Sequence, residues 1–478
     1  MTQREMTREM ISSLGDIVPE LILLGGGIAI LLFALFAPRR AQVGASLLAL
    51  ATAAAATVAS VAMLGSAQEQ TFFDTYSTDD VAVWAKLIIL TATIAVIALS
   101  IPWFARDPRH GEYYTLLLFS SLGAALLAGA TDLMEIVMAL VLSSATSYVL
   151  IAYHRRSKLA SEAAIKYFLM AALTSSTMLI GVALLFGFAG TTTFSGLNEG
   201  LPDNAAALVV GAALIVTALA FKMGSVPAHA WMPDVAEGAP APVAAFVTTV
   251  PKIGGLVALA RLITVLPDTI GWRPLVALLA AATMTLGNLA ALWQDDVRRL
   301  LGWSAVSQTG YALMALAALG RSDLAIPALM YFLVAYVLAN IAAFGVVVEL
   351  RGRTDRASYA GLARAHPLLA MSLVIAFLSL IGIPPLVGFG AKLALFSAAI
   401  EANYEWLAIV AAVNTVVSIF YYARVLAPAY FETLPAPVPV LGRWAASATY
   451  ALTLAVVAAG IVAEPLLETL RDALLLPQ

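Results

Sequence analysis

The chain has 478 residues, of which 62% are hydrophobic and 12% charged, whereas soluble domains are about 45 to 50% apolar and about 25% charged. These proportions exclude a soluble protein, and the balance of 26 basic against 29 acidic residues gives no basic surplus for binding nucleic acid. The absence of cysteine excludes thiolate-bound iron–sulfur clusters and disulfides, and four scattered histidines argue against haem or a clustered metal centre. Electron carriers, if any, therefore lie in other chains.

Apolar stretches of about 20 residues, long enough to cross a bilayer, recur along almost the whole chain. No long polar linker separates them, so we expect one integral membrane unit of all-α fold. The first span lacks a small-residue cleavage site and is expected to be retained. About fourteen spans are predicted, over residues 18–38, 42–65, 81–104, 113–130, 132–153, 163–189, 204–223, 240–265, 274–293, 300–319, 323–349, 367–400, 403–428 and 441–463.

Arginines are concentrated in alternate loops. Positive residues in short loops favour the cytoplasmic side of a membrane, so both termini are expected outside the cytoplasm, with an even number of spans. The arginine-poor loops hold little beyond Arg4, Arg8, Arg273, Arg321 and Arg471. The arginine-rich loops hold Arg39, Arg40, Arg106, Arg109, Arg155, Arg156, Arg298, Arg299, Arg351, Arg353, Arg356, Arg364, Arg424 and Arg443, together with Lys158.

Lysines are distributed differently, since five of the six fall within apolar spans. Arginine does not release its proton in a protein, whereas a buried lysine can. A charge at the centre of a membrane helix costs about 2.5 to 3.5 kcal/mol on insertion scales, so such lysines need a reason to be there. Lys222, Lys252 and Lys392 are therefore candidate proton carriers.

The other two membrane lysines have simpler interpretations. Lys86 lies about one turn into its span, from which its ammonium can reach the interface. Lys166 follows Glu162 by four residues, so an ion pair along one helix face is the alternative to a place in the proton path.

Prolines near the three candidate carriers predict interrupted helices, because proline removes a backbone donor. Irregular backbone at membrane depth is tolerated where it is buried in protein or lines a watery cavity, and broken helices mark the ion site in many transport folds. Proline kinks also occur in other polytopic proteins. The prolines at the predicted breaks are Pro227, Pro233, Pro251, Pro384 and Pro385.

Polar residues between the lysines could complete a hydrated path. His229 could titrate near neutral pH, although a structural hydrogen bond explains it equally well. The other polar residues have a similar alternative, because such side chains commonly bond neighbouring membrane helices. They are Asp234, Glu237, Asn288, Ser304, Ser307, Gln308, Tyr311, Tyr331, Tyr336 and Asn340.

The stretch from Phe221 to Lys252, FKMGSVPAHAWMPDVAEGAPAPVAAFVTTVPK, closely resembles the signature of the proton-translocating, antiporter-like subunits of respiratory complex I. Within that group it is most similar to subunit N of bacterial NADH:quinone oxidoreductase. Three further segments support the resemblance, which covers about residues 110 to 430. They are EAAIKYFLMAAL around Lys166, RRLLGWSAVSQTGYALMALA from Arg298 and SLIGIPPLVGFGAKLALFSAAI around Lys392.

The resemblance implies fourteen helices in two inverted antiporter-like repeats, 113–265 and 274–428, whose helices seven and twelve are broken. Three N-terminal helices, 18–104, and a C-terminal helix, 441–463, flank the repeats. By motif match it assigns Lys222, Lys252 and Lys392 to the hydrated proton path. Subunit M usually has glutamate where Lys392 stands, and subunit L has a long lateral helix that is absent here, so both features favour subunit N.

The resemblance also implies a membrane-arm subunit of a proton-translocating NADH:quinone oxidoreductase in the bacterial inner membrane, with both termini periplasmic. This chain itself would perform no redox chemistry. Flavin, iron–sulfur clusters and quinone are expected in partner subunits, and the expected partners are other membrane subunits, including further antiporter-like chains. A cation/proton antiporter, a membrane-bound hydrogenase-type subunit and a structural, non-pumping paralogue remain as alternatives.

One position departs from the family pattern. The fifth helix usually has a glutamate seven residues before a tyrosine, as in E-L-x-S-L-x-x-Y, and VLSSATSY places Val141 there. Glu135 lies six residues earlier, which is about 120° around the helix and roughly 9 Å toward its outer end. It is therefore either a poor substitute in the proton path or an interfacial, helix-N-terminal charge. We expect a divergent isoform with altered proton coupling.

Overall fold

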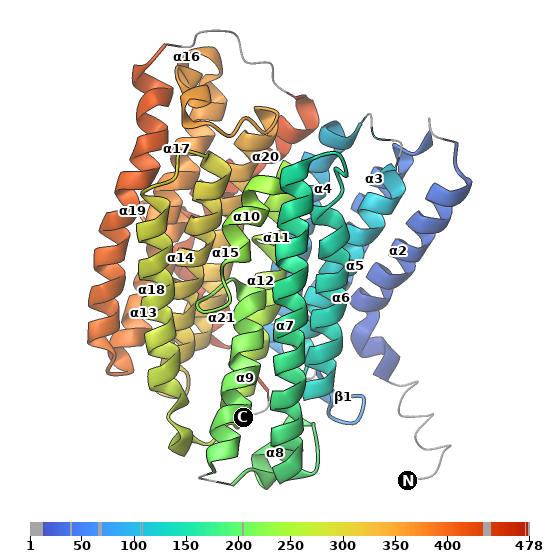
Figure 1. Cartoon of the computed structure of the whole chain (residues 1–478), viewed down its shortest axis with the longest axis vertical. Coiled ribbons are helices and arrows are strands. Elements are labelled where there is room, and N and C mark those ends of the chain that lie inside the picture. Colours follow the sequence, from blue (N-terminus) through green and yellow to red (C-terminus); the bar gives the residue numbers. More distant parts are fainter. Residues whose placement is uncertain are drawn as a thin grey trace.

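The computed structural model describes residues 13–38, 41–65, 69–105, 107, 109–202, 205–433, 441–473 and 475–476. These residues form an all-α bundle whose helices run along one long axis (Figure 1), which confirms the predicted fold class. The described sheet is one short hairpin, β1 (Gln70–Thr71) paired with β2 (Tyr76–Ser77). Of the arginines used to predict orientation, Arg4, Arg8, Arg39, Arg40 and Arg106 lie outside the described residues.

Twelve helical segments of the described chain are long and apolar enough to cross a membrane. A short 3-10 turn, η1 (Ser13–Ile17), leads into the first of them. They are α2 (Val18–Phe36), α3 (Gly44–Ala62), α4 (Asp80–Phe104), α5 (His110–Gly129), α6 (Leu133–Ile151), α7 (Lys158–Ala189), α9 (Ala206–Met223), the pair α11 (Ala241–Val247) and α12 (Val250–Val265), α13 (Trp272–Ala291), α15 (Ala325–Glu349), α19 (Glu405–Phe431) and α20 (Arg443–Ile461).

The two remaining predicted spans also contain helices. α14 (Val297–Ala318) has 22 residues, about 33 Å at 1.5 Å per residue, and Arg298 and Arg299 stand at its start. α17 (Pro367–Ile381) and α18 (Val387–Glu401) are two 15-residue halves on either side of a break. Each of the fourteen predicted ranges therefore contains one helix or one helix pair.

Short elements fill stretches that hydropathy predicts as connections, because they are too brief to give an apolar window. The most important is α10 (Trp231–Gly238), which follows α9 after a break and so makes the seventh span a broken helix. The others are α8 (Phe194–Gly200), η3 (Asp268–Ile270), η4 (Arg356–Tyr359), α16 (Leu362–Ala365) and α21 (Ala463–Arg471).

The centre of the bundle is occupied by the span Ala241–Val265, whose apolar window is 100% buried, and by α15, whose window is 94% buried. The rim helices α2 and α20 bury only 28% of theirs. Large apolar side chains such as Leu35 and Leu454 are exposed on these rim helices, as expected for surfaces that face lipid.

The loops gather at two opposite ends. At one end, arginine-bearing loops contact one another: Arg109 donates to the carbonyl of Tyr153 (3.2 Å), and Asp295 pairs with both Arg356 and Arg424. At the other end, the backbone N–H of Leu476 donates to Asp79 beside the start of α4 (2.7 Å). The first and last described segments both lie at this second end (Figure 1), as an even number of spans requires. We call it the terminal end.

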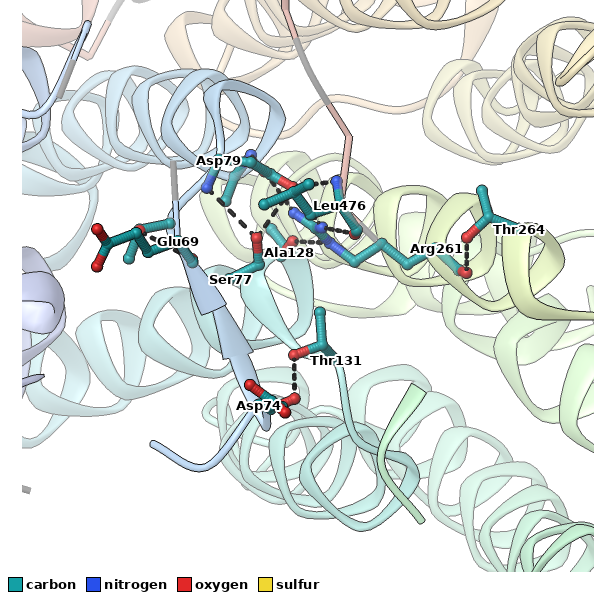
Figure 2. A network of polar contacts seen from close by, with 11 residues as sticks. Glu69, Asp74, Ser77, Asp79, Ala128, Thr131, Arg261, Thr264 and Leu476 are labelled. Atoms are coloured by element: carbon teal, nitrogen blue, oxygen red, sulfur yellow. Dashed lines mark hydrogen bonds and ion pairs between the residues drawn. The ribbon is translucent and has the colours of Figure 1, made fainter. Parts of the chain in front are cut away.

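A fully buried arginine holds the terminal end together (Figure 2). Arg261 in α12 donates to both carboxylate oxygens of Asp79 (2.5 and 2.6 Å), to the carbonyl of Ala128 (2.9 Å) and to the carbonyl of Leu476. Asp79 also caps α4 by accepting the N–H of Ala82 (2.8 Å). One ion pair thus joins α4, α5, α12 and the C-terminal segment.

This ion pair leads to a stability prediction. Asp79→Asn leaves the Arg261 charge buried without its counter-ion, and breaking a buried pair in this way costs about 3 to 5 kcal/mol. We expect a clear fall in the thermal unfolding midpoint of the detergent-solubilised protein. Asp268→Asn is the matched control, because its partner Arg273 pairs with a carboxylate that is 68% exposed, and exposed pairs contribute about 0 to 1 kcal/mol. Equal shifts for the two variants would contradict the structural role of Arg261.

Candidate functional site

Lys222 lies in the last turn of α9, where it is 1% exposed. The helix ends directly after it because Gly224 adopts a left-handed conformation, with φ of +71°. The Lys222 ammonium donates to the hydroxyl of Ser144 (3.1 Å) and to that of Tyr167 (3.5 Å). No ion pair of Lys222 with a carboxylate is found among the described residues, so two neutral hydroxyls hold this ammonium.

The break after Lys222, residues 224–230, separates α9 from α10 and contains Pro227. Side chains of other helices satisfy the backbone groups that the break frees, as membrane depth requires. The carbonyl of Met223 accepts from Thr309 (2.9 Å), and the N–H of Val226 donates to Thr283 (3.2 Å). The prediction for Pro233 is wrong: it lies in the first turn of α10, where a helix does not need its missing N–H.

Lys252 is 2% exposed and stands in the first turn of α12. Its ammonium donates to the carbonyl of Ala305 (2.6 Å) and to the hydroxyl of Tyr336 (3.2 Å). Thr248 and Thr249 separate α11 from α12, so this span is also interrupted, in addition to the two breaks that the family resemblance implies. Pro251 itself lies in the first turn of α12, so the prediction that it stands at the break is wrong by the same reasoning as for Pro233.

The same tyrosine stabilises that interruption. The hydroxyl of Tyr336 donates to the carbonyl of Thr248 (2.9 Å), while the amide of Asn340 donates to the hydroxyl of Thr249 (2.8 Å). Both polar side chains come from α15 and lie within the buried centre of the bundle. The break and the lysine therefore share one polar pocket.

Lys392 in α18 is 4% exposed and repeats the arrangement in the second half of the chain. α17 ends where Gly382 takes a φ of +94°, and Pro384 and Pro385 lie in the break that follows. The ammonium of Lys392 donates to the freed carbonyl of Ile381 (3.0 Å) and stands 4.0 Å from the centre of the Tyr311 ring. One carbonyl dipole and one aromatic face, both attractive to a cation, thus hold the charge.

The three lysines form a row across the bundle, on α9, α12 and α18. On one side, a Cβ added to Gly255 of α12, one turn beyond Lys252, would lie 3.5 Å from the Cβ of Lys222. On the other side, α14 separates Lys252 from Lys392: the carbonyl of Ala305 contacts the former and Tyr311 the latter. The structure therefore places Lys222 against α12, which carries Lys252, and places Lys252 and Lys392 on either side of α14.

Lys166 does not join this row. It is 45% exposed and pairs with Glu162 four residues earlier (2.7 Å) and with Asp234 (2.8 Å). Arg299 extends this surface network by pairing with Asp234 and Glu237. The ion pair along the helix face is therefore present, and Lys166 lies at the surface, outside the buried row.

Glu135 is not brought to Lys222 either. It lies in the first turn of α6 at the terminal end, where its N–H donates to the capping carboxylate of Asp132 (3.1 Å). Val141, two turns further along α6, is 43% exposed and stands one turn before Ser144, which accepts from Lys222. The carboxylate expected beside Lys222 is therefore absent, and Glu135 does not replace it.

Several of the other polar candidates bond neighbouring helices, which was their alternative interpretation. Asn288 donates to Asn414 (3.0 Å), the hydroxyls of Ser304 and Tyr422 are 2.5 Å apart, and those of Tyr311 and Thr415 are 3.0 Å apart. His229 lies in the break between Lys222 and α10, with its ring centre 5.7 Å from that of Trp303. A hydrogen-bond partner for its Nδ1 is not found in the described part of the chain.

Lys86 is the residue that the sequence interpretation missed. Instead of reaching the interface, it is fully buried and pairs with Glu20 of α2 at 2.8 Å. Local spacing gives no hint of this pair, because the two residues are 66 positions apart. A lone glutamate at the start of the apolar stretch 18–38 was the signal that could have suggested it.

The chain is similar to a known family of membrane subunits and to individual members of it. A family model described as NADH:quinone oxidoreductase/Mrp antiporter, transmembrane, matches residues 130–418. NADH-quinone oxidoreductase subunit N of Mycobacterium sp. (strain JLS) is 41% identical over 450 residues, which cover 93% of this chain and 96% of the relative. NADH-quinone oxidoreductase subunit N 1 of Streptomyces griseus is 44% identical over 456 residues, with the same coverage.

Solved structures agree with these relatives. A chain of respiratory complex I from Thermus thermophilus with bound aureothin matches with a TM-score of 0.80 and 29% identity, over 94% of this chain and 99% of that one. A chain of the Mrp complex from Dietzia sp. DQ12-45-1b matches with a TM-score of 0.85 and 22% identity, over 96% and 98%. The second likeness concerns the fold alone.

Proposed function

This chain belongs to the NADH-quinone oxidoreductase subunit N family, and we propose that Lys222, Lys252 and Lys392 carry protons across the membrane while quinone is reduced elsewhere in its complex. The row of three buried lysines at helix breaks is the observation that carries this proposal. Each ammonium is held by hydroxyls, carbonyls or an aromatic ring, groups that also tolerate the neutral amine. A lysine in this row can therefore lose its proton without leaving a buried carboxylate unpaired.

The energetics of such a relay are modest. Moving one charge against 100 mV costs about 2.3 kcal/mol. A thousandfold change in the proton affinity of a lysine corresponds to about 4 kcal/mol, so electrostatic switching of that size is sufficient. The redox reaction supplies this work from outside the chain, and the lysines lose and regain protons in sequence.

The proposal extends to the surroundings of the chain. The arginine-rich end faces the cytoplasm and the terminal end faces the periplasm of a bacterial inner membrane. Residues 113–265 and 274–428 are the two inverted repeats, each with a broken helix that bears a lysine. Other membrane subunits, further antiporter-like chains among them, flank this one, and flavin, iron–sulfur clusters and quinone are bound by partner chains.

Purification from native membranes tests this assignment. The tagged chain, extracted in mild detergent, is expected to retain flavin and iron–sulfur subunits, identified by mass spectrometry, together with NADH:quinone activity. Recovery with other antiporter-like chains alone, accompanied by sodium-dependent transport without quinone reduction, would instead support a cation/proton antiporter.

A further inference from the structure

Lys86 and Glu20 form a buried ion pair near the terminal end, outside the row of three lysines. Lys86 is fully buried and Glu20 is 3% exposed, and their charged atoms are 2.8 Å apart. The hydroxyl of Tyr76 donates to one oxygen of Glu20, and the Lys86 ammonium stands 5.1 Å from the centre of the Tyr76 ring. α2, α4 and β2 thus each supply one member of this cluster, which we call the Glu20 cluster.

The Glu20 cluster differs from the nearby Asp79–Arg261 pair in two ways. Both carboxylate oxygens of Asp79 are bonded, and arginine keeps its proton. By contrast, Oε2 of Glu20 is buried without a hydrogen-bond partner in the part of the chain that the structure describes, and its cation is a lysine. A buried carboxylate oxygen that accepts no hydrogen bond is a favourable site for a water molecule or for a proton.

A cavity leads from the Glu20 cluster toward the surface. It has a volume of about 460 Å³, and its lining includes Ile17, Tyr76, Asp132 and Glu135. Oε2 of Glu135 is also buried without a partner among the described residues. Tyr76 therefore bonds Glu20 and also lines this cavity, whose otherwise mostly apolar wall carries the carboxylates of Asp132 and Glu135.

The hairpin that carries Tyr76 is held in a strained conformation. Phe72, Phe73 and Asp74 have φ values of +53°, +60° and +63°, a backbone conformation that residues other than glycine adopt at a cost in free energy. Thr131 fixes this turn by donating to the carbonyls of Thr75 and Asp74, both at 2.8 Å, and Figure 2 shows Thr131 beside Asp74. The turn thus holds Tyr76 over Glu20.

Buried hydroxyls lie between this cluster and Lys222. Ser144 of α6 accepts from Lys222, and its neighbour Ser143 contacts Ser120 of α5 through its carbonyl (3.2 Å). The next residue of α5, Ser121, is 2.8 Å from Thr93 of α4, which stands two turns from Lys86 on the same face. The steps between adjacent serines, and from Thr93 to Lys86, are not direct hydrogen bonds, so a proton could cross them only through water.

We propose that the Glu20 cluster is a second proton-exchange site, which releases protons from this chain at the terminal end. A proton passes from the Lys86 ammonium to Glu20, giving a neutral amine and a neutral carboxylic acid. The acid then gives the proton to water in the cavity beyond Tyr76, and the amine takes up another proton from the inner side through the buried hydroxyls. This inference rests on the proposed proton-carrying function of the chain.

Lys86→Arg is the decisive variant, because arginine preserves the charge and the pairing with Glu20 but does not release a proton. We expect the intact complex, reconstituted in liposomes, to assemble normally and to translocate as few protons per NADH oxidised as Lys222→Met does. Lys158→Arg, at an exposed lysine, is the matched control and is expected to match the wild type. If arginine does not fit and Lys86→Arg fails to assemble, the double variant Glu20→Gln/Lys86→Met is used instead, because it buries no charge. We expect the same low proton yield from it.

The possible outcomes separate the two proposals. Wild-type proton yield from an assembled Lys86→Arg or double variant, alongside a reduced yield from Lys222→Met, overturns the Glu20 cluster as an exchange site and leaves the proposed function intact. Wild-type yield from both positions overturns both proposals. A reduced yield at Lys86 with a normal yield at Lys222 supports the Glu20 cluster and overturns the path through Lys222.

Discussion

Replacing Lys222 by methionine is expected to slow proton passage through this chain roughly 100-fold. Methionine fills a similar volume but cannot hold a proton, so the charge would have to cross the site without its carrier. Placing a charge at the centre of a membrane helix costs about 2.5 to 3.5 kcal/mol, which corresponds to that factor in rate. The measurement is the number of protons translocated per NADH oxidised by the intact complex in liposomes.

Lys166→Met is the control for this prediction. Lys166 is 45% exposed in an ion-pair network at the arginine-rich end, so its loss should leave the proton yield unchanged. Equal effects at the two positions would show that loss of a lysine charge, and not its place in the buried row, lowers the yield. A normal yield from Lys222→Met would remove that residue from the path.

Introducing glutamate at Val141 is the second change with a large expected effect. The new carboxylate would stand one turn from Ser144, which accepts a hydrogen bond from Lys222. An opposite charge within about 4 to 6 Å changes the proton affinity of an ionisable group by about 10- to 1000-fold, which favours the charged ammonium. We expect Val141→Glu to slow proton release from Lys222 by about tenfold or more, seen as a changed translocation rate or a changed number of protons per NADH.

Val149→Glu provides a matched comparison. Val149 lies on the same helix and is 50% exposed, close to the 43% of Val141, but it stands eight residues further along. Its replacement adds the same charge to α6 without adding a partner for Lys222. If Val141→Glu changes proton translocation no more than Val149→Glu does, position 141 does not control the rate in this chain.

The spans were predictable from the sequence because hydropathy and length alone decide where a membrane helix can lie. Each predicted range holds a helix or a helix pair, and Pro227, Pro384 and Pro385 lie in true breaks. Lys222, Lys252 and Lys392 could be predicted as candidate proton carriers because they lie in apolar spans near prolines. Their placement relative to one another depends on helix packing. That packing is set by contacts such as Gly255 against Lys222, which no local pattern reveals.

The errors at Lys86 and Lys166 share one physical cause, which is that a charge finds its partner in three dimensions. Lys86 looked free to reach the interface because Glu20 lies on a different helix. Lys166 resembled the buried lysines in hydropathy, yet Asp234 and Glu162 hold it at the surface. Pro233 was expected at a break because a proline signals the end of a helix as readily as its first turn, and only the position of α10 distinguishes the two.

Arginine variants of the three row lysines test the central mechanism most directly. Lys222→Arg, Lys252→Arg and Lys392→Arg each keep a positive charge in place but remove the ability to give up a proton. The quantity to measure is the number of protons translocated per NADH oxidised by the reconstituted complex. If the lysines carry protons, each single variant will lose the contribution of this chain. Wild-type yield from any assembled arginine variant would show that the charge alone is needed there and would contradict a relay of protons through that residue.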